Sequence, residues 1–123
     1  MYVLKTIKWR GESLNLVAAR YVTGNLALRL ELLDDQPFTT VTVNLDIAPP
    51  YPYIAVKNYS ENEGILEVLI DNDIIEVDPV VQIKSGFVSI PVHKLTQPIQ
   101  TIIEQTLPEQ EMRELLNQED VQS

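Results

Sequence analysis

The side chains that could perform catalysis are few in this chain. His93 is the only histidine, and the sequence contains no cysteine. A Ser–His–acid triad would therefore need His93 together with a serine. The candidate serines are Ser60, Ser85 and Ser89, and none lies in the Gly-x-Ser-x-Gly turn that presents such a nucleophile. Because His93 ends an apolar run, we expect a partly exposed residue at the end of a strand, and the sequence predicts no catalytic residue.

The stretch Asp71-Asn72-Asp73 carries side-chain oxygens of the kind that bind calcium. The common calcium loop needs an oxygen ligand at its fifth position and glycine at its sixth. Counted from Asp71, those positions hold Ile75 and Glu76, so the match fails. The glycines also stand singly, which excludes a glycine-rich phosphate loop. We therefore predict no cofactor and no metal site, with weak divalent-cation binding at the acidic residues as the alternative.

Acidic residues are concentrated in one part of the chain. Seven acidic residues and no basic one lie between Lys57 and Lys84. Residues 58–123 hold thirteen acidic and three basic residues, whereas residues 1–57 hold five acidic and six basic ones. A surface charge of one sign attracts basic partners and repels nucleic acid. We therefore expect no direct nucleic-acid binding.

Three of these acids, Glu63, Glu67 and Asp71, recur every four residues, which places them along one side of a helix. Four residues advance about 6 Å along a helix axis. With neighbouring carboxylates, the charge density approaches that of one DNA strand, which has a phosphate about every 3.4 Å. The pattern predicts an acidic face that docks on a basic-grooved protein, such as a nuclease or DNA-processing protein. The residues of this face are Glu63, Glu67, Asp71, Asp73, Glu76 and Asp78. The alternative is a solvated face that only keeps the protein soluble.

The elements that position these residues begin with four predicted strands. Apolar and polar residues alternate along each of them, as half-buried strands require. The strands span residues 3–9, 14–21, 26–32 and 38–45. Turn-forming sequences separate them, namely Arg10-Gly11-Glu12, Thr23-Gly24-Asn25 and Asp34-Asp35-Gln36-Pro37. Short turns between sequential strands predict an antiparallel meander.

The chain changes character after residue 46. Pro49, Pro50 and Pro52 predict a stiff crossover from the sheet to a helix, and the alternative is a proline-rich ligand for an aromatic groove. The sequence Ser60-Glu61-Asn62-Glu63 is typical of a capping box and predicts a helix that starts there. A last strand follows residue 86, and its Pro91 indicates an edge strand or a bulge.

The last part of the chain is predicted to be helical. Pro98 suits the first turn of a helix, and Thr106-Leu107-Pro108-Glu109 resembles a second capping box. Met112, Leu115 and Leu116 line the helix after it. The predicted fold is α+β, with an antiparallel sheet of about five strands and one packed helix. Residues 1–95 form a single domain and residues 96–123 a helical C-terminal extension.

The hydrophobic content of 45% is too high for a wholly disordered chain. The longest apolar runs are only a few residues, so we expect no membrane span, and Lys5, Lys8 and Arg10 interrupt any signal-peptide core. The absence of cysteine fits a reducing compartment. We therefore expect a cytoplasmic protein.

Several stretches resemble a family of small, uncharacterised bacterial proteins, a domain of unknown function carried on plasmids, conjugative elements and phages. The resemblance covers roughly residues 1–95. The matching stretches include Asn25–Leu30, Pro37–Leu45, Asn58–Glu67 and Ser85–Pro91, of which Asn58–Glu67 is the most specific. The family has no assigned activity, so the resemblance implies only a setting, the cargo of mobile DNA. Proteins in that setting often counter host defence.

These observations predict a non-enzymatic, acidic protein-binding module of a mobile genetic element. Its leading role is a DNA-mimic inhibitor of a host defence or DNA-processing protein, of the anti-restriction or anti-CRISPR type. The alternative is an interaction or dimerisation module that uses the apolar side of the C-terminal helix, formed by Met112, Leu115 and Leu116. A small hydrolase ranks below both, and the sequence leaves the oligomeric state open.

Overall fold

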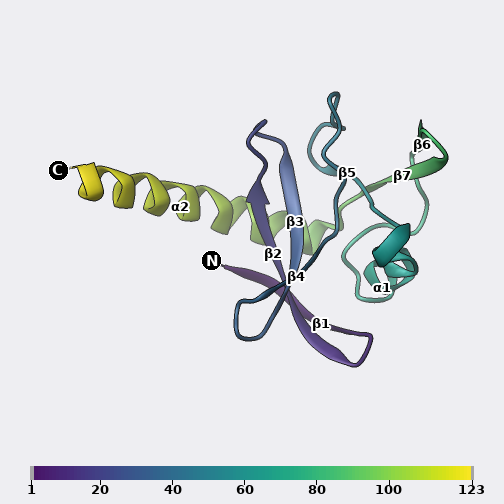
Figure 1. Ribbon diagram of the computed structural model, residues 1–123, viewed down its shortest axis with the longest axis horizontal. Coiled ribbons are helices and arrows are strands. Elements are labelled where there is room, and N and C mark those ends of the chain that lie inside the picture. Colours follow the sequence, from purple (N-terminus) through teal and green to yellow (C-terminus); the bar gives the residue numbers. More distant parts are fainter. Residues whose placement is uncertain (1, 123) are drawn as a thin grey trace.

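The computed structural model describes residues 2–122, with side chains described as far as Arg113 and at Leu115 and Leu116. The described residues form an α+β fold with two antiparallel sheets, a long and a short α-helix, and one 3-10 turn. Figure 1 shows the four-stranded sheet at the centre and the three-stranded sheet beside the short helix α1. The long helix α2 runs past the first sheet and away from the rest of the molecule.

The four-stranded sheet is the predicted meander. Its strands lie in the order β1-β2-β3-β4, so each one pairs with its neighbour in sequence. Their bounds are β1 Val3–Trp9, β2 Glu12–Arg20, β3 Leu26–Leu32 and β4 Pro37–Thr40. Arg10 and Gly11 form the first hairpin turn with φ angles of 51° and 77°, the left-handed pair that a two-residue hairpin loop requires. The fourth strand ends at Thr40 rather than at residue 45.

The three-stranded sheet was not predicted as a separate unit. Its order is β5-β7-β6, and its strands are β5 Tyr53–Ala55, β6 Val81–Ser85 and β7 Val88–Lys94. The seven strands described therefore lie in two sheets, whereas the sequence indicated about five strands in one. The proline-rich residues 47–52 lead into β5 and not into a helix, which corrects the predicted crossover.

Pro91 lies in the central strand β7, so the edge position or bulge predicted for it is wrong. The carbonyl of Pro91 accepts a hydrogen bond from the Val56 N–H at 3.0 Å. Val56 is the first residue after β5, so its pairing with Pro91 comes at the end of the ladder between β5 and β7. The backbone N–H that Pro91 lacks would have made the last hydrogen bond of that ladder. A proline is tolerated there because the lost hydrogen bond would be the last of its ladder.

The helix α1 spans Ile65–Asp71, and a 3-10 turn over Ser60–Asn62 precedes it. The predicted capping box is wrong, because the N-cap is Gly64, with φ 92°, and no side chain of that residue can cap the helix. Asn58 supplies the cap from a distance, since its Oδ1 accepts the Leu66 N–H at 3.0 Å.

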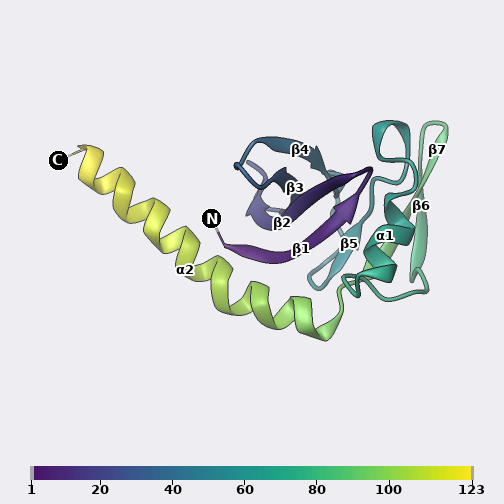
Figure 2. The same cartoon turned by 90° about the horizontal axis from the view of Figure 1, so that it is seen from below.

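The helix α2 spans Gln97–Gln122, with Pro98 in its first turn as predicted. The second capping box is wrong, because α2 continues through Pro108. The Thr106 hydroxyl instead donates to the Ile102 carbonyl, one turn earlier, at 2.7 Å. Figure 2 shows that α2 changes direction part-way along, as expected for a helix that contains an internal proline. Among the described residues, no helix combines the length and apolarity that a bilayer crossing requires.

The main core lies between the inner face of the four-stranded sheet and both helices. Every member is almost completely buried, and the members come from all of these elements. They include Leu14, Leu16, Leu28 and Leu30 of the sheet, Leu69 of α1, and Ile99, Ile103 and Leu107 of α2. A second, smaller cluster consists of Ala55, Ile90 and Val92 in the three-stranded sheet. The three-stranded sheet is therefore joined to the main core on one face and only lightly covered on the other.

Candidate partner-binding surfaces

The six carboxylates predicted to form an acidic face lie in α1, just before it, and in the loop that follows it. All six are exposed, and none of them takes part in an ion pair among the residues described. They are Glu63, Glu67, Asp71, Asp73, Glu76 and Asp78. Figure 1 places α1 and this loop at the end of the molecule that carries β6 and β7.

The regular helical row predicted for these acids is only partly present. Because α1 begins at Ile65, Glu63 lies outside it, at the end of the 3-10 turn. Only Glu67 and Asp71 share the helix at a spacing of four residues. The charge of the segment therefore rests on carboxylates of a helix and an irregular loop, and not on one straight row.

Basic residues of the N-terminal half contact the chain just before and just after α1. The Arg10 guanidinium donates to the carbonyls of Glu61 and Glu63 at 2.6 and 3.1 Å, on the N-terminal side. On the C-terminal side, the Lys5 ammonium donates to the carbonyl of Asn72, where a positive charge also favours the helix dipole. These contacts reduce the local negative charge at the ends of the segment.

Glu61 is the acid that is directly neutralised. Its carboxylate lies 2.5 Å from the Lys57 ammonium, and this hydrogen bond lowers the pKa of Glu61 to about 2. The same contact raises the pKa of Lys57. We define the acidic segment as the carboxylates of α1 and of the loop that follows it, none of which has such a partner among the described residues, namely Glu67, Asp71, Asp73, Glu76 and Asp78.

The apolar residues predicted on the C-terminal helix are exposed. Met112 is 56% exposed, Leu115 52% and Leu116 51%. At about 100° per residue, Met112 and Leu116 lie on the side of α2 opposite to the buried Ile103 and Leu107, and Leu115 lies between the two sides.

Polar contacts hold the other side of α2 against the sheet. Glu111 pairs with Arg20 at 3.0 Å, and the Gln110 side chain accepts the Tyr2 N–H at 3.2 Å. Met112, Leu115 and Leu116 therefore form a separate apolar stripe and not a continuation of the core contact.

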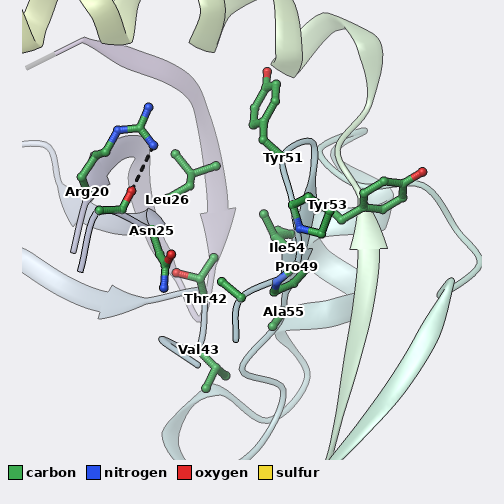
Figure 3. Close-up of a pocket in the computed structure, with 13 residues that line it drawn as sticks. Arg20, Asn25, Leu26, Thr42, Val43, Pro49, Tyr51, Tyr53, Ile54 and Ala55 are labelled. Atoms are coloured by element: carbon green, nitrogen blue, oxygen red, sulfur yellow. Dashed lines mark hydrogen bonds between the residues drawn. The ribbon is translucent and has the colours of Figure 1, made fainter. Parts of the chain in front are cut away.

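A cleft of about 270 Å³ opens where the turn after β2 faces the proline-rich loop (Figure 3). A second cavity of about 220 Å³ adjoins it and shares Arg20, Leu26 and Tyr51 with it. The Arg20 guanidinium is already bonded to Glu111 and to the Gly24 carbonyl, at 3.0 and 3.3 Å. Burial and the nearby carboxylate of Glu104 raise the pKa of Tyr51 to about 12, so its hydroxyl stays protonated near neutral pH. No sequence motif pointed to this cleft, because its walls come from three distant segments.

His93 is completely buried in β7, and the partly exposed strand-end position predicted for it is wrong. Its Nδ1 lies 2.8 Å from the carbonyl of Glu76, in the loop that follows α1. This loop covers the imidazole ring. The residue pattern of β7 alone gives no sign of such a cover. Within the described residues, no three histidine, cysteine or acidic side chains are grouped as a metal site would need.

An apolar groove that sequence reasoning missed lies beside the outer strand β6. Its volume is about 420 Å³. The proline-rich loop forms one wall with Ile47, Pro49 and Pro50, and the strand side forms the other with Val80, Val81 and Ile83. The alternation of Val81 and Ile83 is the only local signal of this groove, because the opposite wall comes from more than thirty residues earlier in the chain.

Comparisons of the chain with protein-family models, with curated proteins and with solved structures found no match.

Proposed function

We propose that this chain is a non-enzymatic protein-binding module that docks its acidic segment on a basic groove of a partner protein. The observation that carries the proposal is the exposure of Glu67, Asp71, Asp73, Glu76 and Asp78 without an ion-pair partner among the described residues. Like charges that are close in sequence repel one another, and a basic partner relieves that repulsion. The resemblance to proteins of mobile elements supports a DNA-mimic inhibitor as the role, of the anti-restriction or anti-CRISPR type.

The geometry favours a compact acidic surface over an extended imitation of duplex DNA. The helical part of the segment contains only Glu67 and Asp71, separated by about one turn. The other three carboxylates follow in the loop that leads to β6. A short segment of this kind matches a local basic pocket, such as the part of a nuclease groove that holds a few phosphates.

The test is capture of partners from bacterial lysate at two salt concentrations. At about 0.05 M salt the Debye length is more than 10 Å, and at about 0.5 M it is a few ångströms, so an electrostatic partner should bind only at low salt. Captured proteins are then challenged with duplex DNA. Release by DNA of proteins that bound at low salt supports the proposal, because the carboxylates and the phosphates would then compete for one groove.

A matched pair of variants separates the acidic segment from net charge. The first carries Glu67→Gln, Asp71→Asn and Asp73→Asn, and the second carries Glu12→Gln, Glu31→Gln and Asp35→Asn on the four-stranded sheet and its turn. Both variants remove three negative charges. The first should lose DNA-releasable partners and the second should keep them. Equal retention by both would contradict the proposal.

The second candidate function is self-association or docking through α2. The exposed stripe of Met112, Leu115 and Leu116, outside the buried side of the helix, favours it. An apolar contact weakens little with salt, so it differs from the first candidate in this respect. Sedimentation of the wild type and of the double variant Leu115→Ser, Leu116→Ser tests it. A dimer that persists at high salt and is lost in the variant would support this function, and a monomeric wild type that captures nothing at high salt would contradict it.

A further inference from the structure

The strand β6 has an open edge. It pairs with β7 on one side, and among the described residues no backbone hydrogen bond reaches its other side. Of the other outer strands, β5 is covered because Val43 donates to the Ala55 carbonyl at 3.0 Å, and β4 because the Asn62 side chain donates to the Thr40 carbonyl at 2.6 Å. The remaining outer strand, β1, is in contact with α2. An uncovered edge is a template on which another strand can pair.

The register shows which backbone groups of β6 point outward. Gln82 lies opposite Pro91, which has no N–H and whose carbonyl accepts from Val56 on the far side of β7. The Gln82–Pro91 pair is therefore of the non-hydrogen-bonded type, and the Gln82 N–H and carbonyl face away from β7. Lys84 is two residues along, so its N–H and carbonyl face the same way.

The apolar groove lies over the face of the three-stranded sheet that carries Val81 and Ile83, and Tyr53 of β5 and Val92 of β7 also line it. Ile47 is 89% exposed, Val80 58% and Val81 51%, so both walls present uncovered apolar surface. Contiguous apolar surface around an open strand edge is the arrangement that proteins use to add a strand from a peptide. Figure 1 shows β6 at the opposite end of the molecule from the C-terminus of α2, which leaves the approach to the edge free of that helix.

We propose that β6 binds an extended peptide segment of a partner as an added antiparallel strand. Alternate apolar side chains of the segment would pack against Val81 and Ile83 at the rim of the groove, and its backbone would pair with Gln82 and Lys84. The charges of β6 set its direction, because Asp78 precedes the strand and Lys84 lies near its end. An antiparallel segment brings its C-terminal end beside Asp78 and its N-terminal end beside Lys84. The segment therefore carries lysine or arginine at its C-terminal end and an acid at its N-terminal end.

This inference rests on the proposed function only in that both invoke a basic partner. The surfaces differ, since the edge of β6 uses backbone groups and an apolar groove, whereas the acidic segment uses the carboxylates of α1 and its loop. Asp78 belongs to both surfaces, but substitutions of Glu67, Asp71 and Asp73, or of Gln82, change only one of them, so the two proposals fail separately.

The first experiment titrates the protein with two labelled decapeptides of identical composition, followed by fluorescence anisotropy. One has the order Glu-Val-Thr-Val-Thr-Val-Thr-Val-Lys-Lys, and the other has the order Lys-Lys-Val-Thr-Val-Thr-Val-Thr-Val-Glu. Both are blocked at their ends. The first peptide should bind about tenfold more tightly, since opposite charges then meet at both ends of β6. Equal binding, or no binding of either peptide, would overturn the inference.

The second experiment compares Gln82→Pro with Gln82→Ala. Proline removes the outward N–H and leaves the bonds between β6 and β7, whereas alanine keeps that N–H and loses the same side chain. Gln82→Pro should weaken binding of the first peptide at least about tenfold, and Gln82→Ala should leave it nearly unchanged. Circular dichroism verifies that both variants keep the fold. A Gln82→Pro variant that is folded and binds as the wild type does would overturn the inference.

The third experiment addresses charge and the competing occupant. Asp78→Asn should weaken the first peptide about two- to fivefold at low salt, and the distant Glu12→Gln should have no effect. The variant with Glu67→Gln, Asp71→Asn and Asp73→Asn should still bind the peptide, even where it has lost its partners in lysate. A wild-type dimer that Gln82→Pro converts to a monomer would overturn the inference, because the occupant of the edge would then be a second copy of the chain.

Discussion

The two sheets of this molecule are both antiparallel, yet they differ in how much of each is buried. The four-stranded sheet has strands of up to nine residues, and its inner face supplies four leucines that are completely buried. The three-stranded sheet has three members in its own cluster, and β6 has no buried residue. The first sheet, with the two helices, therefore carries most of the stability, while the second offers an edge and a groove.

The two sheets also differ in how far apart in sequence their partners lie. Each strand of the first sheet pairs with the next one through a turn of a few residues. In the second sheet Tyr53 pairs with Lys94, and the helix α1 and its loop lie between them in the chain. Closing such a long segment has an entropic cost that grows with its length. The second sheet therefore depends on the first for a surface to assemble against.

The largest expected effect comes from comparing the two hydrophobic clusters with equivalent substitutions. Leu28→Ala in the main core should lower the free energy of unfolding by about 4–5 kcal/mol, and Ile90→Ala in the small cluster by about 2 kcal/mol. The site at Leu28 is enclosed on all sides, whereas the surroundings of Ile90 can relax toward solvent. Chemical denaturation followed by circular dichroism measures both values. Equal losses would show that the two sheets share one core.

The two sides of α2 should contribute very differently to the free energy of unfolding. Leu107 is 4% exposed and belongs to the main core, whereas Leu115 is 52% exposed. Leu107→Ala should therefore cost about 2–4 kcal/mol and Leu115→Ala less than about 0.5 kcal/mol in a dilute sample. Thermal unfolding of the two variants tests this difference. A large loss for Leu115→Ala that depends on protein concentration would mean that its side of the helix is an interface.

The meander could be predicted from the sequence because its determinants are local. Alternating residues over 26–32 indicate a strand, and Arg10-Gly11 indicates a tight hairpin. Pro98 in the first turn of α2 was predictable for the same reason. The exposure of Met112, Leu115 and Leu116 is not a property of their spacing alone, since the same spacing would also suit a buried stripe.

The second sheet could not be predicted because its determinants lie far apart. β5 has three residues, too few for a periodic pattern, and its partner strand is almost forty residues away. Both predicted capping boxes were wrong. At the start of α1, the side chain of Asn58 accepts the Leu66 N–H, and near Pro108 no new helix begins because α2 is continuous there. His93 was predicted at an exposed strand end because the loop that covers its ring, and whose Glu76 carbonyl contacts its Nδ1, lies about ten residues before β7 in the chain.

Asn62 joins the four-stranded sheet to the segment before α1 and should have an intermediate effect. It is completely buried, its Oδ1 accepts the Thr39 hydroxyl at 2.6 Å, and its Nδ2 donates to the Thr40 carbonyl at 2.6 Å. Asn62→Ala leaves the half-buried Thr39 hydroxyl and Thr40 carbonyl without their partner and should cost about 2–3 kcal/mol. Asn58→Ala, which removes one cap contact with Leu66, should cost about 1 kcal/mol. Equal costs in chemical denaturation would contradict the role of Asn62 as the link between β4 and the segment before α1.

The smallest effect concerns Glu61, the acid just before the acidic segment, which forms an ion pair with Lys57. Lys57 holds the pKa of Glu61 at about 2, below its usual value of 4.5. A lowered pKa in the folded state means that the pair stabilises the fold above pH about 4.5 and loses this contribution as the pH falls toward 2. Lys57→Met should therefore return the pKa of Glu61 toward 4.5, as measured by NMR titration of its carboxyl carbon. An unchanged titration midpoint for Glu61 would show that Lys57 does not set the charge of this carboxylate. The contrast between the paired Glu61 and the unpaired carboxylates of the acidic segment would then be lost.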